Sequence, residues 1–273
     1  MNYFFNKILF LGVVMKGKKV LFSLILISLL SLASASAQSL KGMSFNGATG
    51  LIAIPTGQIG WERTADFGFD LGYHAIIDEE TAHIPKASIS LFKLAEISFA
   101  YDTQFGDKNE DIILGGKIQL PTKGTFVAIG ANFQMLQTGG NDDNVTQIYL
   151  AATYPGNFFG MPSMTTVVVG KSFGDPIPKS DIDFGMGFDL LLFPKVFQNY
   201  IHWVTDFANF SYSAQAVGAN AAQRGTFNTG IRIDLGSIPA FKKYKFVIDA
   251  LLTDAMDDNR AFALGVAFGA PLQ

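Results

Sequence analysis

Apolar residues alternate with small or charged residues along segment 183–194, whose sequence is DFGMGFDLLLFP. The apolar positions are Phe184, Met186, Phe188, Leu190 and Leu192, and the positions between them include Asp183, Gly185, Gly187 and Asp189. A β-strand points successive side chains to opposite faces of its sheet, so this pattern predicts a strand with one wholly apolar face. A strand of a soluble sandwich can carry the same pattern, so this segment alone does not decide the fold class.

Repetition of the pattern after residue 62 decides it. The predicted strands cover residues 66–75, 85–92, 94–103, 111–120, 125–137, 147–154, 165–173, 183–194, 200–212, 226–235, 244–253 and 260–270. Strands of this length cross a bilayer when tilted, and a β-protein in lipid must close on itself to pair its backbone groups. The sequence therefore predicts an all-β fold, an antiparallel transmembrane β-barrel of about twelve strands, with roughly ten to fourteen compatible with the pattern.

The segments between the predicted strands fall into two groups that alternate along the chain. One group is polar or small and comprises Gly106–Glu110, Gly139–Asn144, Ala214–Gln223 and Asp254–Asn259. The other carries Pro, Gly and Lys and comprises Lys93, Pro121–Gly124, Pro194–Gln198 and Gly236–Lys243. Because consecutive antiparallel strands turn at opposite ends of a barrel, we expect the two groups to lie on opposite rims, without deciding which rim is extracellular.

Residues 1–37 have the features of a cleavable signal peptide, with translation from Met15 as an alternative start. Lys16, Lys18 and Lys19 precede the apolar run Val20–Leu32, and Ala35-Ser36-Ala37 supplies small residues for cleavage. An uncleaved membrane anchor is the alternative, but this run is shorter than the ~20 residues that span a bilayer. We therefore expect a mature chain from Gln38 that is exported to the outer membrane.

The mature chain divides into a segment over residues 38–61 and a barrel over residues 62–273. Residues 47–56 read GATGLIAIPT. This stretch resembles the opening of the YjbH-like family of outer-membrane proteins, which begin their mature region with G-x-T-G-L-I-x-x-P-[ST]. The resemblance covers about a dozen residues, and it implies a role in exopolysaccharide production or export. Without that role, the segment is a first strand or a plug that caps one end of the barrel.

Composition and charge agree with an exported membrane protein. Hydrophobic residues make up 49% of the chain and charged residues 16%, with 28 glycines and 26 phenylalanines. Removing the four lysines of residues 1–37 from the 20 basic residues leaves 16 against 23 acidic residues. This acidic balance argues against nucleic acid as a partner and leaves cation preference in a pore as a hypothesis. The absence of cysteine excludes disulfides, thiol catalysis and cysteine metal sites.

Charged residues on the predicted inner face are the candidate site. They are Asp70, Lys117, Asp183, Asp189, Asp206, Arg232, Asp234 and Asp249. Twelve strands enclose a lumen wider than that of eight-stranded barrels and narrower than that of large porins, so we expect a narrow channel, open or plugged. The charges either neutralise one another and hydrate the interior, or they contact a permeant solute or ligand.

The pattern gives no support for catalysis, a cofactor or a metal site. His74, His83 and His202 are scattered, with His74 expected at the end of a strand near an interface. No local arrangement of Ser and His matches an outer-membrane phospholipase, and no Gly-rich stretch leads into a helix that could hold phosphate. The acidic pairs Asp142-Asp143 and Asp257-Asp258 are typical of solvated turns rather than of calcium sites. We therefore do not expect an enzyme.

Aromatic residues near the predicted strand ends favour anchoring in a bilayer. They are Trp61, Tyr73, Tyr101, Tyr154, Phe173, Phe193, Tyr200, Tyr212 and Tyr244. We predict a narrow channel or transporter for small solutes, or an accessory to surface polysaccharide export. The alternative is a non-transporting structural or adhesive surface protein. The expected partners are outer-membrane lipids, small solutes or polysaccharide, and the barrel-assembly machinery during biogenesis.

Overall fold

The structure is a computed structural model, and it describes residues 42–61, 65–78, 81–104, 109–138, 141–174, 182–209, 225–238, 241, 243–257 and 260–272. The predicted signal peptide, Tyr212 and segment 214–223 lie outside these residues. In the described part of the chain, no helix is both long and apolar enough to cross a membrane.

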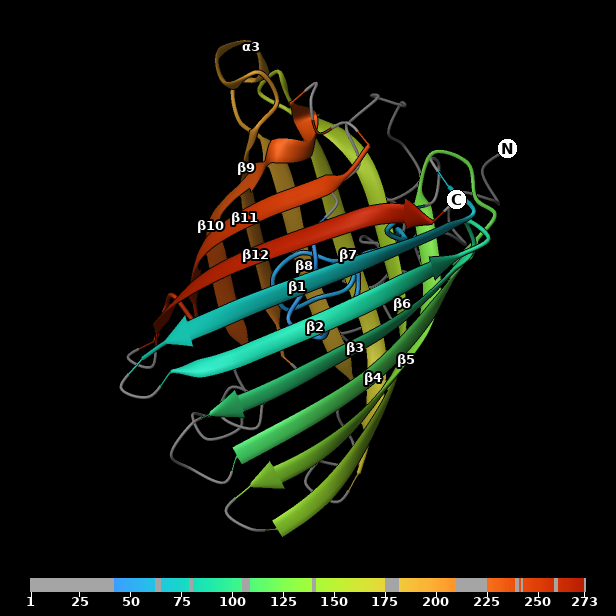
Figure 1. The fold of residues 1–273 in the computed structure, drawn as a ribbon, viewed down its shortest axis with the longest axis vertical. Helices are drawn as coiled ribbons and strands as arrows, with labels where there is room; N and C mark the ends of the chain where they lie inside the picture. Colours follow the sequence, from blue (N-terminus) through green and yellow to red (C-terminus); the bar gives the residue numbers. More distant parts are fainter. Residues whose placement is uncertain are drawn as a thin grey trace, which may run out of the picture. The chain divides into compact units, whose positions relative to one another are not determined.

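Twelve antiparallel strands form a single closed ring (Figure 1). They are β1 (Phe67–Ile77), β2 (Ala82–Leu91), β3 (Ala95–Gln104), β4 (Asn109–Leu120), β5 (Phe126–Thr138), β6 (Asn141–Phe158), β7 (Met161–Phe173), β8 (Asp183–Leu191), β9 (Ile201–Ala208), β10 (Thr226–Asp234), β11 (Lys245–Thr253) and β12 (Ala261–Leu272). Each strand pairs with its neighbours in sequence, and β1 closes the ring on β12 with Phe67 opposite Leu272 and Ile77 opposite Phe262. This confirms the predicted fold class. Closure leaves no strand edge unpaired, which a bilayer requires.

The predicted strands all appear, and five of them differ from the observed strands by three or more residues at an end. Strands β2 and β7 begin three and four residues earlier than predicted, at Ala82 and Met161. Residues 147–154 belong to the longer β6, which reaches Phe158. The prediction for 183–194 was three residues too long, because Phe193 adopts a left-handed backbone (φ 39°) and Pro194 begins the short helix α3 (Pro194–Phe197). The prediction for 200–212 was also too long, since β9 ends at Ala208.

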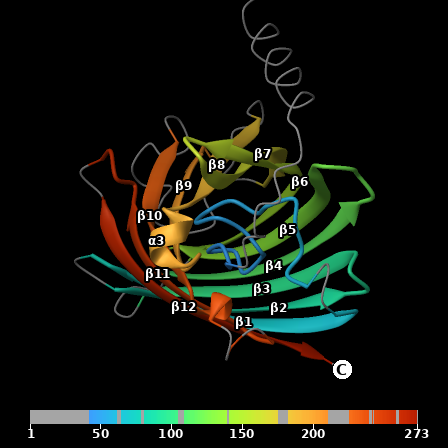
Figure 2. The same ribbon diagram turned by 90° about the horizontal axis from the view of Figure 1, so that it is seen from above.

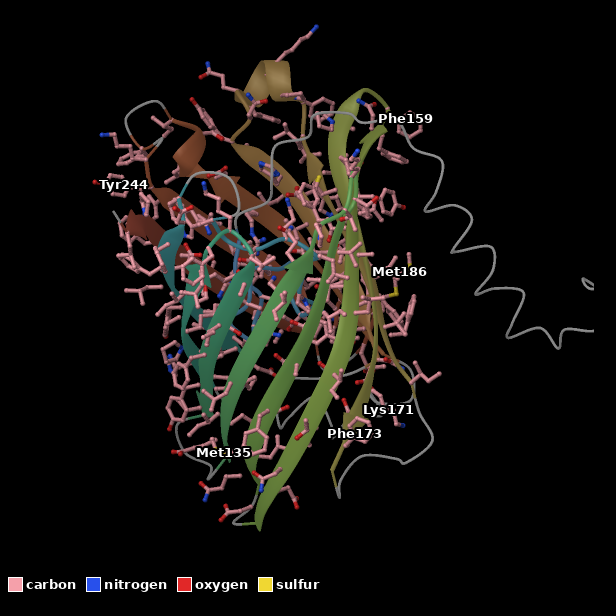
Figure 3. All side chains as sticks on the ribbon, turned by 90° about the vertical axis from the view of Figure 1, so that its right-hand side faces the viewer. Met135, Phe159, Lys171, Phe173, Met186 and Tyr244 are labelled. Carbon is pink, nitrogen blue, oxygen red and sulfur yellow. The ribbon has the colours of Figure 1, made fainter. Side chains whose placement is uncertain are left out.

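The outer face of the barrel is apolar and the inner face is polar. In β12 the exposed positions are Phe262, Leu264, Val266 and Phe268, and the positions between them are buried alanines and glycine. Figure 3 shows Met186 and Phe173 projecting outward from the wall, as the alternation predicts. Exposed large apolar side chains over buried charged ones reverse the arrangement of a soluble protein, which is the pattern of a barrel that meets lipid.

The two predicted groups of connections lie on opposite rims. The turns 92–94, 121–125 and 159–160, helix α3 and the 3₁₀ turn η2 (Leu235–Ser237) share a rim with the end of β12, which we call the C-terminal rim. The connections that follow β1, β3, β5, β7, β9 and β11 lie at the opposite rim. This agrees with the prediction from sequence composition for every group member that the structure describes.

Residues 42–61, which we call the inner segment, lie within the ring of strands. Figure 2 looks into the barrel and shows this segment, in blue, surrounded by the strands. It forms isolated bridges between Met43 and Thr49 and between Gly50 and Pro55, and the N–H of Leu51 donates to the carbonyl of Ile54 at 3.0 Å. The segment is therefore a folded turn structure and contributes no strand to the barrel wall.

Candidate functional site

All eight residues predicted for the lumen are buried inside the barrel. Their exposed fractions run from 1% for Asp206 and Arg232 to 7% for Asp183 and Asp234. They fall into two sets, according to whether or not they contact the inner segment. The burial of so many ionisable groups demands partners, because an unpaired charge in a low-dielectric interior is strongly destabilising.

Arg232 connects the barrel wall to the inner segment. Its Nε donates to Asp249 Oδ1 at 2.7 Å and its Nη2 to Asp249 Oδ2 at 3.0 Å, a bidentate pair across β10 and β11. Its Nη1 also donates to the carbonyl of Gly50 at 3.1 Å, and Nη2 to that of Leu51 at 3.0 Å. One guanidinium therefore holds both a wall carboxylate and two carbonyls of the inner segment, which its planar fork of donors permits.

Asp206 binds a run of backbone N–H groups. Its Oδ2 accepts from the N–H of Ile52 at 2.8 Å, of Ala53 at 2.7 Å and of Ile54 at 3.2 Å. Its Oδ1 accepts from the side-chain amide of Asn228 at 2.8 Å. The turn of the inner segment thus forms a backbone nest around a carboxylate, the arrangement by which consecutive N–H groups bind anions.

Lys117 binds the same segment from the side of the lumen opposite Arg232 and Asp206. Its Nζ donates to the carbonyls of Thr49 at 2.7 Å and Thr56 at 3.2 Å, and lies 3.4 Å from Glu96 Oε1. Glu96, which is 1% exposed, accepts from the N–H of Thr49 at 2.7 Å, from its hydroxyl at 2.6 Å and from the N–H of Gly60 at 2.8 Å. The pair Glu96–Lys117 therefore offers both an acceptor and a donor to the segment.

Asp70 belongs to the same network of contacts between the wall and the inner segment, at the point where the segment leads toward β1. Its Oδ2 accepts from Lys245 Nζ at 2.7 Å and its Oδ1 from Trp61 Nε1 at 3.1 Å. The ammonium of Lys245 also lies 4.8 Å from the centre of the Trp61 ring, a cation–π contact. Trp61 is only 4% exposed, so its predicted place in an aromatic girdle at the membrane surface is wrong. Its indole nitrogen instead meets a buried carboxylate.

Two buried histidines pair with carboxylates of the wall. Nε2 of His74 lies 3.1 Å from Asp249 Oδ2, and Nδ1 of His202 lies 2.7 Å from Asp189 Oδ1. His74 faces the lumen at 1% exposure, so the prediction of an interfacial position at a strand end is wrong. Strand β1 extends beyond it to Ile77, and Gly265 opposite leaves room for the imidazole, since a Cβ there would lie 2.3 Å from Nε2.

The remaining predicted residues bond to the wall itself. Asp183 accepts from Gln147 Nε2 at 2.8 Å and from Ser172 Oγ at 2.5 Å. Asp234 accepts from the N–H of Gly236 at 2.9 Å and so caps the 3₁₀ turn at the C-terminal rim. These carboxylates stabilise strand-to-strand and strand-to-turn contacts, and no hydrogen bond that the structure gives them reaches the inner segment.

The inner segment itself carries no charge. Residues 42–61 contain no Asp, Glu, Lys, Arg or His, so the charged wall residues bind its backbone groups, the hydroxyl of Thr49 and the indole N–H of Trp61. Two glycines allow the close approach. Gly47 has a φ of 83°, and a Cβ on it would lie 2.4 Å from the carbonyl oxygen of Phe99. A Cβ on Gly57 would lie 2.2 Å from the carbonyl oxygen of Phe126.

Sequence analysis missed four residues of this network. They are His74, Lys86, Glu96 and Lys245, all buried at 4% or less. Lys86 donates to the carbonyl of Ser44 at 2.8 Å and lies 5.5 Å from the Phe45 ring. Strand alternation carried the signal for Glu96, because its neighbour Ile97 is apolar and both lie in the predicted strand 94–103. In β2 the outward residues include Pro85 and His83, which are not strongly apolar. The alternation between an apolar outer face and a polar inner face, which would have marked Lys86 as an inner residue, was therefore weak.

The interior has no group of three or more His, Cys, Asp or Glu side chains placed to hold a metal ion, among the residues that the structure describes.

A closed antiparallel barrel with an apolar outer face and a charged interior is the architecture of outer-membrane proteins. The chain is an outer-membrane β-barrel.

Comparison with known proteins gives likeness in structure but not in sequence. No family model matches the chain, and no curated protein matches it. Among solved structures, the KdgM porin is similar with a TM-score of 0.49 at 6% identity, covering 75% of this chain and 99% of that one. The NanC porin is similar with a TM-score of 0.49 at 8% identity, covering 75% of this chain and 100% of that one. Omp33 of Acinetobacter baumannii has a TM-score of 0.46 at 11% identity, covering 76% and 98%.

Proposed function

We propose that this chain is a narrow outer-membrane channel for small solutes, and that its inner segment is a plug that closes the lumen. The observation that carries the proposal is the set of buried wall charges whose partners are backbone groups of a charge-free segment. Withdrawal of the plug would leave a water-filled path lined by Lys86, Glu96, Lys117, Asp206 and Arg232. A barrel that served only as a membrane anchor would have no need of these charges and could fill its interior with apolar side chains.

The charge of the wall predicts the preference of the open channel. The buried charged residues of the described strands are four cations and nine carboxylates. The cations are Lys86, Lys117, Arg232 and Lys245, and the carboxylates are Asp70, Glu96, Asp102, Asp111, Asp183, Asp189, Asp206, Asp234 and Asp249. Rings of carboxylates favour cations in pores, so the open state should conduct cations better than anions.

The domain boundaries follow from the same proposal. Residues 1–37 act as the signal peptide, residues 38–61 as the N-terminal segment that contains the plug, and residues 62–273 as the barrel. Bacterial barrels keep both chain ends and their short turns on the periplasmic side. We therefore assign the C-terminal rim to the periplasm, which places the chain entry of the plug on that side.

A second candidate function comes from the resemblance of residues 47–56 to YjbH-like proteins. The residues of that motif include Thr49, Gly50, Leu51 and Thr56, whose backbone groups bind Glu96, Arg232 and Lys117. The motif therefore falls on the proposed plug and not on the barrel wall. In this version of the proposal, the plug gates an accessory to polysaccharide export.

Planar-bilayer recording of the mature chain, residues 38–273, tests the proposal with an engineered lock. A Cβ on Gly72 would lie 2.9 Å from Met43 Sδ, so the side chains of positions 43 and 72 face each other. The pair Met43→Cys and Gly72→Cys lets oxidation link the segment to β1, and thiol titration shows whether the link has formed. The native chain has no cysteine to compete with them. We expect discrete cation-preferring conductance steps from the native chain, no steps from the oxidised double variant, and their return on reduction.

The single variants Met43→Cys and Gly72→Cys are the matched controls, and both should conduct under oxidising conditions. Conductance that continues through the oxidised pair would show that the segment does not close the lumen. A native chain that folds in detergent but conducts nothing would favour the non-transporting surface protein.

A further inference from the structure

We propose that the lumen contains a recognition site for peptide backbone, and that short peptides are the solutes it selects. The inference rests on the proposed channel function and names its substrate class. The plug occupies this site as a stand-in for the solute, because the wall binds it almost entirely through amide N–H and carbonyl groups. Two side chains supply the exceptions, the hydroxyl of Thr49 through its bond to Glu96 and the indole N–H of Trp61 through its bond to Asp70.

One half of the site lies on β3 and β4. Glu96 and Lys117 face each other across these two strands and present a carboxylate and an ammonium side by side. Both act on Thr49, since Glu96 accepts from its N–H at 2.7 Å and Lys117 donates to its carbonyl at 2.7 Å. A single residue, Thr49, thus satisfies both charges with its N–H and its carbonyl, the two groups that every non-proline residue carries.

The other half lies on β9 and β10 and repeats the same chemistry. Asp206 accepts from three consecutive N–H groups, at 2.7 to 3.2 Å. Arg232 donates to the two carbonyls that precede them, at 3.0 and 3.1 Å. Residues 49–54 therefore span the lumen between two opposite charge pairs. All four charged side chains are at most 3% exposed, so the site is preformed and shielded from water.

The site has equal numbers of positively and negatively charged side chains, and this balance indicates which class of solute can occupy it. Lys86, Lys117 and Arg232 stand against Glu96, Asp206 and Asp249 in the part of the lumen that surrounds the plug. A balanced set favours a neutral or zwitterionic solute over an ion of either sign. A short peptide meets this requirement, because it has amide donors and acceptors along its length and opposite charges at its two ends.

Two tripeptides of identical composition separate backbone recognition from size. Trialanine and trisarcosine are isomers, but trisarcosine carries methyl groups on its amide nitrogens and lacks the amide N–H groups that Glu96 and Asp206 accept. A site built around a hydrogen-bond donor rejects an analogue that lacks it. In liposome-swelling assays with the full mature chain, we expect trialanine to enter about tenfold faster than trisarcosine.

Variants of the site test whether its carboxylates cause the faster entry of trialanine. The double variant Glu96→Gln and Asp206→Asn should admit the two isomers at similar rates. The matched control Asp183→Asn changes a buried lumen carboxylate that does not bind the plug, and it should keep the preference for trialanine. Equal rates for the two isomers in the native chain would overturn the peptide site while leaving the channel function intact.

A binding measurement applies even to a barrel that conducts nothing. The chain has two tryptophans, and Trp203→Phe leaves only Trp61, at the end of the plug against Lys245. We expect trialanine to shift the Trp61 emission saturably as it displaces the plug, and trisarcosine to leave the emission unchanged. Swelling with no solute would refute the channel function alone, whereas the same emission response to both isomers, or to neither, would refute peptide recognition.

Discussion

Two regions of the same lumen solve the problem of buried charge in different ways. Around the plug, Glu96, Lys117, Asp206 and Arg232 bind backbone groups that lie 36 or more residues away in sequence. Toward the rim opposite the C-terminal rim, Asp183 accepts hydrogen bonds from Gln147 and Ser172, and Asp111 accepts one from Gln134. All of these residues lie on the barrel wall. The first region depends on a separate segment of the chain, whereas the second is held by neighbouring strands. Variants in the two regions should therefore have different effects.

Arg232→Met should have the largest effect on stability. The variant removes both plug bonds and leaves the carboxylate of Asp249, which is 2% exposed, without its guanidinium partner. Breaking a buried ion pair from one side costs about 3–5 kcal/mol of unfolding free energy. Urea titration of the refolded barrel measures this loss. The double variant Arg232→Met and Asp249→Leu should recover part of it, and equal losses in the single and double variants would contradict the pairing.

Asp206→Asn should release the plug with less damage to the wall. The change removes the negative charge that three N–H groups of the plug share, while its partner Asn228 keeps a neutral acceptor. Bonds to a charged group contribute more than bonds to a neutral one, and we expect about 2 kcal/mol, or about thirtyfold, in favour of the open channel. The fraction of time that single channels spend open measures the shift. An unchanged open fraction would show that the nest does not hold the plug.

Gly57→Ala should act on the plug by crowding. Its added Cβ would lie 2.2 Å from the Phe126 carbonyl oxygen and 3.1 Å from that of Ala151, and neither backbone can move freely within the barrel. Overpacking of this kind costs about 1–2 kcal/mol and should raise the open fraction. Gly116→Ala is the control, because a Cβ there meets nothing nearer than 3.7 Å. Equal open fractions in the two variants would contradict a tightly fitted plug.

Asp183→Asn should have the smallest effect. Asparagine keeps an oxygen that can accept from Gln147 Nε2 and Ser172 Oγ, so we expect a loss below about 1 kcal/mol in unfolding free energy and no change in open fraction. A large rise in open fraction would show that the two regions are coupled, and the distinction between them would then fail.

The wall of this barrel was predictable from sequence, because its signal is local. Strand β12 alternates phenylalanine, leucine and valine with alanine and glycine over its length, and a period of two needs no knowledge of neighbouring strands. The same alternation placed Asp206 and Arg232 on the inner face. It could not show that the carboxylate of one and the guanidinium of the other meet a turn more than 150 residues earlier in the chain.

The errors of sequence analysis have a common physical origin. Trp61 and His74 were placed by their type and by their position near predicted strand ends. Each is instead fixed by a long-range partner, Asp249 for His74 and the Lys245–Asp70 pair for Trp61. Residue type gives the average environment of a side chain. A single buried partner on a nearby strand is enough to override that average.

The seam between β1 and β12 sets the order in which the barrel can assemble. Phe67 pairs with Leu272, so the first strand waits for the last, and closure of so long a loop is slow. The inner segment lies immediately before β1 in the chain. It must therefore be within the nascent sheet before the seam forms, or it must thread a finished ring afterwards. The first order lets the segment act as an internal template, around which Arg232 and Asp206 of the later strands arrange as the ring is sealed.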